Sequence, residues 1–335
     1  MREMIELSIF VLVLFAIIPI LAKYAMPVFS SILKYIKKGK LGLIWTSMAL
    51  GFLPVHERIY ATSGVLKSMI DGHIFEFETE EEKRNAGILM YIWTHHFYLW
   101  SLMEKTILIP MTYFGLSYYH MLKINILPLI GYLIVGLIAS VLLIPNEVEI
   151  NVKPEEIPLE KKKNGFIMYG LLALTLIAMI KYGFLAFIIG GLLIFLMFID
   201  DFDYREVRWK HALMLLLIVW IGFFIRTQID VQQVAKSIQT SLPVALLLAF
   251  CIAFILGSSS RYSLVAVILT SVYGLKTLPL FLTFEFLGYL ISPFHQCTLV
   301  PQFLFGCDRK KFYITASALG IASVIGGILT YLFVV

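Results

Sequence analysis

Two short apolar segments joined by a polar turn constrain the fold more than any other feature of the chain. The segments cover residues 241–256 and 262–271, and Gly257-Ser-Ser-Ser-Arg261 lies between them. A helix that crosses a bilayer needs about 20 apolar residues, so each segment is too short to span the membrane comfortably. Irregular polar backbone at membrane depth is tolerated only where protein encloses it or where it lines a cavity. The pattern therefore predicts a re-entrant helical hairpin with a buried tip.

Composition places the whole chain in the same class. Of its 335 residues, 60% are hydrophobic and 15% are charged, and the mean hydropathy is +0.88. A soluble domain is about half apolar and a quarter charged. We therefore expect an all-α, multi-pass protein of the cell membrane, with the lipid bilayer as its main partner. The formal net charge of +5 then reflects cytoplasmic Lys and Arg, and we expect no nucleic-acid partner.

The cysteines and short motifs argue against an enzyme. Cys251, Cys297 and Cys307 lie in or beside apolar segments, which favours small packing residues over disulfides or a metal knuckle. His56-Glu57 lacks the second histidine of a zinc-protease helix, and no phosphate-binding glycine loop or nucleophile elbow occurs. We predict no catalytic residues, no metal and no cofactor, apart from Na⁺ or H⁺ as a coupling ion.

The first half of the chain repeats the pattern of the second half. Two short apolar arms flank a polar tip at Pro54–Arg58, and a later apolar run is interrupted at Thr94-His95-His96. In the second half, the run after the hairpin is interrupted at Ser292-Pro-Phe-His295. A spanning segment follows each interrupted run. Matched hairpins and broken helices that enter from opposite sides are the architecture of inverted-repeat transporters.

We therefore predict two inverted repeats, each with a re-entrant hairpin and a broken transmembrane helix. In the first repeat, an uncleaved spanning helix over residues 4–22 and an amphipathic interfacial helix over 27–36 precede the hairpin. The first repeat covers 1–145 and has a hairpin at 41–70, a broken helix at 86–121 and a helix at 124–144. A linker covers 146–164. The second repeat covers 165–335 and has three scaffold helices, a hairpin at 243–273, a broken helix at 278–305 and a helix at 312–333.

The distribution of Lys and Arg predicts the orientation, because these residues concentrate in cytoplasmic loops. With residues 34–40 inside, the loops at 71–85, 146–164, 200–210 and 308–311 also fall on the cytoplasmic side. Together with residues 34–40, these loops hold most of the Lys and Arg of the chain. The first hairpin then enters from the cytoplasm and the second from outside.

Two motifs resemble those of a known family. His95-His-Phe-Tyr-Leu-Trp100 and Leu290-Ile-Ser-Pro-Phe-His-Gln-Cys-Thr-Leu-Val300 are similar to the broken-helix motifs of the prokaryotic membrane family called domain of unknown function 401. That family belongs to the ion transporter superfamily, with the citrate, divalent-anion and arsenite transporters. The resemblance covers about residues 51–305 and implies an elevator-type transporter, often a homodimer. The chain departs from the family at Val55-His-Glu-Arg58, where a Pro/Gly-rich loop of small residues is usual.

The hairpin tips carry the candidate substrate-binding residues. Arg58 and Arg261 would be costly at membrane depth unless they had a partner or a function, and guanidinium groups bind carboxylates and oxyanions well. Alternatively, each pairs with a neighbour, as Arg58 could with Glu57, or reaches the membrane surface. Ser258, Ser259 and Ser260 add hydroxyl groups at the second tip, although serines also suit an ordinary turn. Ser292 and His295 are the candidates at the second helix break.

Four titratable residues are candidates for ion or proton coupling: Glu57, His95, His96 and Glu285. Histidine titrates near neutral pH and could carry a coupled proton, but packed and hydrogen-bonded histidines are commoner. The spacing of the histidines does not specify a zinc site. Glu285 lies within an apolar half-helix, where Thr283 or an arginine could also explain it as a structural residue.

These observations predict a secondary active transporter of a small anion, driven by a proton or sodium gradient. Two other classes stay open. The chain could be a non-transporting scaffold or receptor derived from the same fold, or, more distantly, an intramembrane metal-dependent enzyme.

Overall fold

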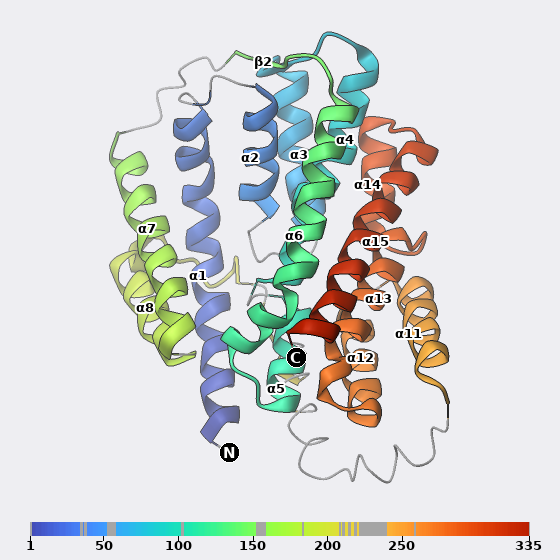
Figure 1. Cartoon of the computed structure of the whole chain (residues 1–335). Helices are drawn as coiled ribbons and strands as arrows, with labels where there is room; N and C mark the ends of the chain where they lie inside the picture. The colour runs from blue at the N-terminus through green and yellow to red at the C-terminus, as the bar shows by residue number, and fades with distance from the viewer. Residues whose placement is uncertain are drawn as a thin grey trace.

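The chain is almost entirely helical in the computed structural model, which confirms the all-α class (Figure 1). The structure describes residues 2–33, 36, 39–51, 58–101, 104–151, 159–182, 184–207, 209, 212–213, 216–217, 220, 240–257 and 259–334. The described α-helices are α1 (Arg2–Leu33), α2 (Gly39–Gly51), α3 (Arg58–Asp71), α4 (Glu80–His95), α5 (Lys105–Phe114), α6 (Tyr118–Leu143), α7 (Leu159–Tyr182), α8 (Phe184–Met197), α11 (Leu242–Leu256), α12 (Ser259–Tyr273), α13 (Leu278–Ile291), α14 (Gln296–Phe305) and α15 (Arg309–Phe333).

The two pairs of short helices lie at opposite ends of the molecule. In Figure 1, α2 and α3 occupy the upper part, whereas α11 and α12 occupy the lower part. The interrupted helices have opposite directions too, because α4 lies above α5 while α14 lies above α13. α6 and α15 extend along most of the height and run in opposite directions. Both ends of the molecule therefore contribute a helical pair that stops near mid-height.

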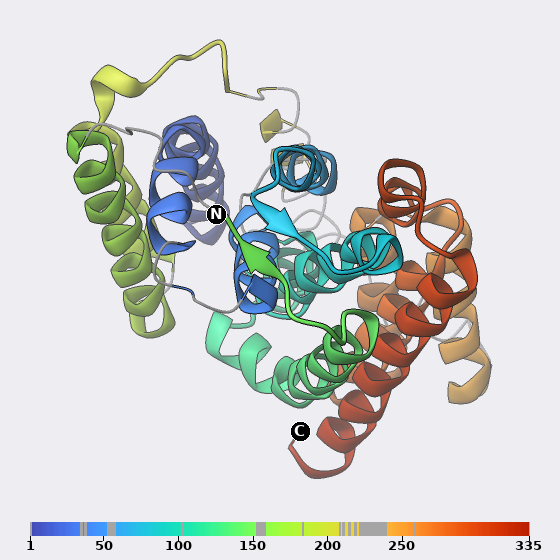
Figure 2. The same cartoon turned by 90° about the horizontal axis from the view of Figure 1, so that it is seen from above.

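The helices of the two halves contact one another in a matched way. α2 packs on α3 and α4, and α11 packs on α12 and α13. The second arm of each pair also reaches the other half, because α3 contacts α14 and α12 contacts α5. α6 and α15 pack against each other in the middle. α1, α7 and α8 form a separate group at one side, which Figure 2 shows from above.

Glycine in the left-handed conformation follows the C-terminal ends of α5 and α11. The residue after α11 is Gly257, with φ of 55°, and the residue after α5 is Gly115, with φ of 65°. This left-handed conformation is easily adopted only by glycine, and it lets the next amide bond back to the last helical turn. In both cases the glycine N–H donates to a carbonyl four residues earlier, Ala253 O and Met111 O.

α6 and α15 approach each other at small residues. A Cβ on Gly326 would lie 2.4 Å from the backbone N of Pro128, and a Cβ on Gly131 would lie 2.7 Å from the carbonyl O of Ala322. Real side chains do not come this close to backbone atoms, so glycine is required for the observed crossing. Small residues at helix crossings are typical of helices that associate in membranes.

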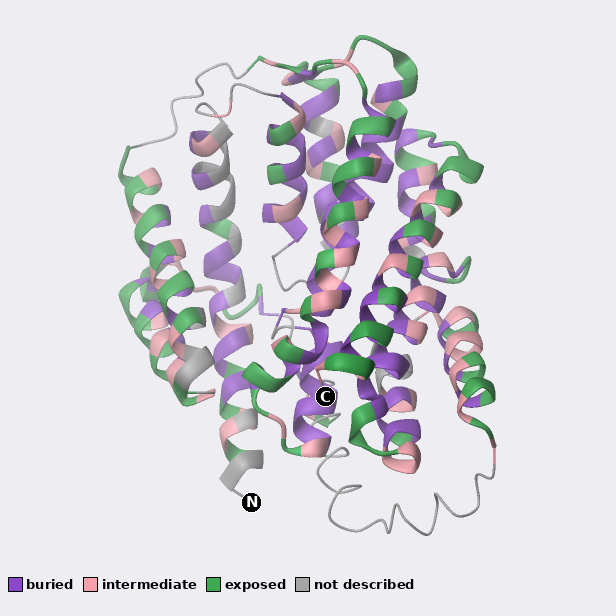
Figure 3. Ribbon diagram, viewed as in Figure 1, coloured by how far each residue is buried: buried purple, intermediate pink, exposed green. Residues whose placement is uncertain are grey.

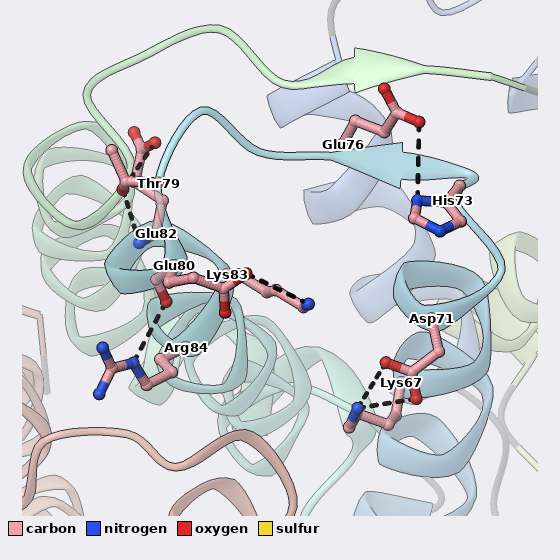
Figure 4. A network of polar contacts seen from close by, with 9 residues as sticks. All are labelled: Lys67, Asp71, His73, Glu76, Thr79, Glu80, Glu82, Lys83 and Arg84. Atoms are coloured by element: carbon pink, nitrogen blue, oxygen red, sulfur yellow. Dashed lines mark hydrogen bonds and ion pairs between the residues drawn. The ribbon is translucent and has the colours of Figure 1, made fainter.

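A small polar assembly covers the upper end of the molecule. Strand β1 (Phe75–Glu76) pairs antiparallel with β2 (Glu149–Ile150) and so joins the two loops that we predict to be cytoplasmic. Thr79 caps α4 by accepting a hydrogen bond from the Glu82 amide, and the exposed pair Lys67–Asp71 lies on α3 (Figure 4). Exposed ion pairs contribute little stability, typically about 0–1 kcal/mol each. The cap and the strand pairing therefore hold this end.

Lys311, at the start of α15, forms an ion pair with Glu81, at the start of α4. The Lys311 ammonium lowers the pKa of the Glu81 carboxyl group. Nearby, the Cys307 thiol lies 2.9 Å from the carbonyl O of Arg84, and burial raises its pKa to about 12. Cys307 is thus a packed, unreactive cysteine, as the sequence indicates.

Large apolar side chains cover the outside of the longest helices. Among the described residues, α6 and α15 are long and apolar enough to cross a membrane. Only 33% of the most apolar window of α6 and 44% of that of α15 are buried within the chain, so much of their apolar surface faces outward (Figure 3). Exposed residues on these two helices and on α8 include Ile130, Ile134, Leu137, Val141, Leu142, Leu185, Ile189, Leu193, Leu196, Ile321, Ile325 and Leu332.

Several predicted boundaries are wrong. α1 is one continuous helix to Leu33, without a separate amphipathic helix from residue 27, because it continues to bury side chains such as Tyr24 and Val28. α4 begins at Glu80 within the segment predicted to be a loop, because Thr79 caps it. The helix predicted to begin at residue 124 begins at Tyr118, where the Ser117 side chain caps α6.

Other predictions fall on residues that the structure does not describe. They include residues 54–57 of the first hairpin tip, Ser258 and most of residues 208–239, in which part of the predicted scaffold of the second repeat lies. The linker predicted over 146–164 is described only in part, and its end from Leu159 belongs to α7.

The α6–α15 crossing can be tested with matched glycine substitutions. Gly326→Ala is expected to reduce the free energy of unfolding by about 1–3 kcal/mol, because the added methyl group must push the Pro128 backbone away. Gly170→Ala on α7 is the control, since nothing lies within 4 Å of its Cβ position; it should be neutral or stabilise by up to about 1 kcal/mol. Unfolding of both purified variants in mild detergent would measure the difference. Equal stability would show that α6 and α15 do not approach so closely.

Candidate functional site

The two helix breaks lie against each other in the interior. α4 ends at His95 and continues as a 3₁₀ turn, His96–Leu99, and α13 ends at Ile291, five residues before Gln296 begins α14. His95 and His295 are almost fully buried, with 2% and 4% of their surface exposed, and their Nε2 atoms are 3.4 Å apart. The structure thus joins two histidines that are 200 residues apart in the chain.

Two tyrosine contacts join the same breaks. The hydroxyl groups of Tyr98 and Tyr289 are 2.7 Å apart, which is hydrogen-bond distance. The Tyr91 hydroxyl donates to the carbonyl O of Leu290 at 2.8 Å. Each histidine also packs against a tyrosine of its own half, with ring centroids 3.9 Å apart for Tyr91–His95 and for Tyr289–His295. None of the three tyrosines was a predicted site residue.

The hydrogen-bond partners assign the same tautomer to both histidines. His95 Nδ1 lies 2.8 Å from the carbonyl O of Tyr91. His295 Nδ1 lies 3.2 Å from the carbonyl O of Gly257, at the tip of the α11–α12 pair. A carbonyl oxygen only accepts hydrogen bonds, so each Nδ1 carries the proton. In the neutral form, the Nε2 of each ring then presents a lone pair toward the other ring.

His96 is also buried, with 2% exposure, but it belongs to a different cluster. Its Nδ1 accepts a hydrogen bond from Trp100 Nε1 at 2.9 Å, and its ring lies parallel to the Trp100 ring, at 6°. It is therefore the opposite tautomer to His95, with its proton on Nε2 when neutral. His96 therefore interacts with Trp100 and is not part of the His95–His295 pair.

The predicted binding residue Ser292 holds the second break in place. Its hydroxyl donates to the carbonyl O of Phe254 on α11 at 2.5 Å and accepts from the Phe294 amide at 3.2 Å. A Cβ on Gly257 would lie 2.8 Å from the His295 amide nitrogen, so the hairpin tip touches the break directly. The second hairpin and the second helix break therefore form one packed unit.

Glu285 is completely buried in the middle of α13. Its carboxyl group lies beside the backbone of Ala266 on α12, and no described donor completes a hydrogen bond with either oxygen. Thr283 is not its partner, because the Thr283 hydroxyl donates to the carbonyl O of Pro279. Burial of a carboxyl group costs free energy unless a partner offsets the loss of its hydration.

The remaining predicted residues are at the hairpin tips, where the structure describes less. Arg58 begins α3, and Ser259, Ser260 and Arg261 lie in the first turn of α12, but their side chains are outside the described part. Glu57 and Ser258 are outside it altogether. Their proposed roles therefore stay predictions.

Cys297 lies in a position that was not predicted from the sequence. It was interpreted as a packing residue, yet its Sγ and the facing nitrogens of His95 and His295 all lie within 4.8 Å of one another. The spacing His295-Gln-Cys297 at the start of a helix could have signalled it. The contribution of His95, from the other half of the chain, had no signal in the sequence.

One groove lies apart from this cluster. It has a volume of about 580 Å³ and lies between the start of α4, the end of α6 and the start of α15, with Glu81, Asn85 and Lys311 among its lining residues. It contains no predicted site residue.

Comparisons with known proteins add no further assignment. No protein-family model matches the chain, and no curated protein matches its sequence. The resemblance carried by the two broken-helix motifs therefore stays a prediction.

A double-mutant cycle can measure how strongly the breaks are joined. Tyr98→Phe and Tyr289→Phe each remove one hydroxyl of the 2.7 Å pair. We expect the two losses of unfolding free energy to be non-additive by about 0.5–1.5 kcal/mol, the usual net value of one hydrogen bond. Tyr113→Phe is a suitable control, because Tyr113 OH contacts Ser271 instead. Additive losses for Tyr98 and Tyr289 would show that the hydroxyl groups do not interact.

Proposed function

We propose that the protein is a secondary active transporter of a small anion in the cell membrane. The observation that carries the proposal is the meeting of two helix breaks, one from each half of the chain, next to the tip of a short helical pair. Interrupted helices that meet at mid-height are used by transporters to place polar groups and helix ends around a solute.

A membrane location is supported by the outward-facing residues. Aliphatic side chains cover the outer faces of α6, α8 and α15, and soluble monomers rarely expose contiguous apolar surface of this extent. Water would be an unfavourable environment for these faces, whereas the hydrocarbon of a bilayer suits them. The multi-pass topology and the cytoplasmic position of the 146–164 linker are parts of this proposal.

The inverted repeat is supported by element order and by packing. α2 to α6 correspond in order to α11 to α15, and the contacts of α2 with α4 and of α3 with α14 have counterparts in those of α11 with α13 and of α12 with α5. The two sets lie in opposite directions in Figure 1. In such a protein, α1, α7 and α8 would belong to the scaffold against which the hairpins and broken helices move.

The preference for an anion rests on Arg58 and Arg261, which occupy corresponding positions after the two tips. Helix N-termini also favour anions, and both residues lie in the first turn of a helix. Resemblance to the family of unknown function agrees with this substrate class and with a homodimer. Ser258, Ser259 and Ser260 would add hydroxyl donors at the second tip.

Glu285 is the best candidate for proton coupling. It is a buried carboxyl group without a described hydrogen bond, on the helix that leads to the second break. Intramembrane carboxyl groups of this kind often carry the coupled proton in transporters. It therefore replaces the histidines as the residue on which the coupling proposal depends.

A non-transporting scaffold or receptor is the alternative function. The internal hydrogen bonds of Ser292 and Tyr91 would suit it, because such contacts also stabilise a static bundle. Uptake by the purified protein decides between the two functions.

The anion site can be tested by uptake into reconstituted vesicles. Radiolabelled citrate, succinate, sulfate and arsenite would be supplied with an inward proton or sodium gradient. Wild-type protein is expected to accumulate at least one of them, and Arg58→Ala/Arg261→Ala should reduce that uptake more than about tenfold, because the solute loses its charged partners. Arg205→Ala, an exposed loop residue, is the control. Full uptake by the double variant would refute the anion site.

Proton coupling predicts a separate effect of Glu285→Gln. The variant keeps the shape of the side chain but cannot release a proton. It should lose gradient-driven accumulation while it keeps exchange of labelled for unlabelled solute across the vesicle membrane. Glu149→Gln, at the exposed end of the molecule, should leave both unchanged. If Glu285→Gln still accumulates solute against its gradient, Glu285 does not couple the proton.

A further inference from the structure

We propose that His95, His295 and Cys297 bind one Zn²⁺ ion where the two helix breaks meet. This inference goes beyond the transport function, and it reverses the prediction from sequence that the protein binds no metal. It rests on the geometry of three buried or half-buried side chains and on the hydrogen bonds that orient them.

The two imidazole rings present their lone pairs to each other. Both Nδ1 atoms are held by main-chain carbonyl groups, those of Tyr91 and Gly257, so both Nε2 atoms are acceptors in the neutral rings. Two lone pairs that face each other at 3.4 Å repel. A cation between them turns this repulsion into two bonds. An Nδ1–H that donates to a carbonyl is also the usual way in which proteins orient a zinc-binding histidine.

The distances suit zinc in particular. With Zn–N bonds of about 2.0–2.1 Å in a tetrahedral site, two nitrogen ligands are separated by about 3.3 Å. The observed separation of the two Nε2 atoms is 3.4 Å, which matches this spacing. A Zn–S bond of about 2.3 Å requires the sulfur about 3.6 Å from each nitrogen. Cys297 Sγ lies within 4.8 Å of both, so the sulfur would move closer to the nitrogens when it binds the ion.

The ligand set selects the class of metal. Two imidazole nitrogens and a thiolate suit Zn²⁺ and disfavour Mg²⁺ and Ca²⁺, which prefer oxygen ligands. On binding, Zn²⁺ replaces the proton of the Cys297 thiol, and the released proton passes to water, so the thiolate offsets one of the two positive charges of the ion. Three protein ligands leave the fourth tetrahedral position for water or another small ligand.

Bound Zn²⁺ would connect the two halves of the chain. His95 is the last residue of α4, whereas His295 and Cys297 lie at the start of α14. The two helices already contact each other, and the ion would add bonds between them at the centre of the molecule. A proton shared by the two Nε2 atoms is the rival explanation for their approach, and it predicts that no metal binds.

Cobalt substitution tests the proposal directly. The full-length protein would be purified, stripped with a chelator and titrated with Co²⁺, which reports tetrahedral geometry and sulfur ligation by its absorption. We expect one Co²⁺ per chain, a sulfur-to-cobalt charge-transfer band and displacement by one equivalent of Zn²⁺. Wild-type protein that binds no stoichiometric Co²⁺ or Zn²⁺ would overturn the proposal.

Matched variants locate the ligands. Cys297→Ser should abolish the charge-transfer band. His95→Gln or His295→Gln should weaken Zn²⁺ binding by more than about tenfold, because loss of even a group that only orients a metal ligand typically costs about that much affinity. The controls are Cys251→Ser and His96→Gln, whose side chains lie outside the cluster. Equal losses in the controls and the ligand variants would contradict the assignment.

A measurement on the wild-type chain tests the site even if the variants fail to fold. Bound Zn²⁺ should slow alkylation of Cys297 by more than about tenfold, because the thiolate is coordinated, and leave the rate at Cys251 unchanged. Mass spectrometry of both cysteines in the same sample gives the two rates. Cys307 stays slow throughout, since burial raises its pKa to about 12. If Zn²⁺ does not protect Cys297, the site is refuted.

Discussion

A helix that ends inside a protein leaves its last carbonyl groups without intrahelical partners, and the centre of this molecule is built around that constraint. The carbonyls of Phe254, Gly257 and Leu290 terminate α11 and α13, and each accepts from a side chain of another element: Ser292, His295 and Tyr91. Unpaired, each buried carbonyl would cost about 1–3 kcal/mol. The polar residues at the breaks are thus required for folding before any function is considered.

The same requirement explains why the breaks lie together. α4 ends beside α14, and its terminal carbonyls need donors as well; Tyr132 on α6 donates to the carbonyl O of Ile92. Placing the breaks side by side lets one set of tyrosine and histidine side chains serve both. The histidines then meet by their Nε2 atoms because their Nδ1 atoms are already used. The close approach of the two histidines therefore follows from the way the helices are capped.

Much of the helical arrangement could be predicted from the sequence, and the misses have specific causes. The first hairpin arms, predicted at 41–53 and 59–70, are α2 and α3, and the Pro293-containing break lies between α13 and α14. α4 was predicted too short because the cap at Thr79 was not recognised before a run of acidic residues. α1 was predicted to end at residue 22, where the continuous apolar run stops, whereas α1 continues to Leu33. Short-range sequence patterns therefore mispredict helix ends where packing against neighbouring helices determines them.

The sequence by itself determined the all-α class, the short paired helices and the two interrupted ones, because apolar length, glycine and proline act locally. It also identified His95, His295 and Glu285 as unusual polar residues in apolar runs. Only the tertiary structure decided that His95 faces His295, that Cys297 joins them and that Glu285 has no described hydrogen bond. The two histidines are 200 positions apart, and their meeting depends on how α4 and α14 pack.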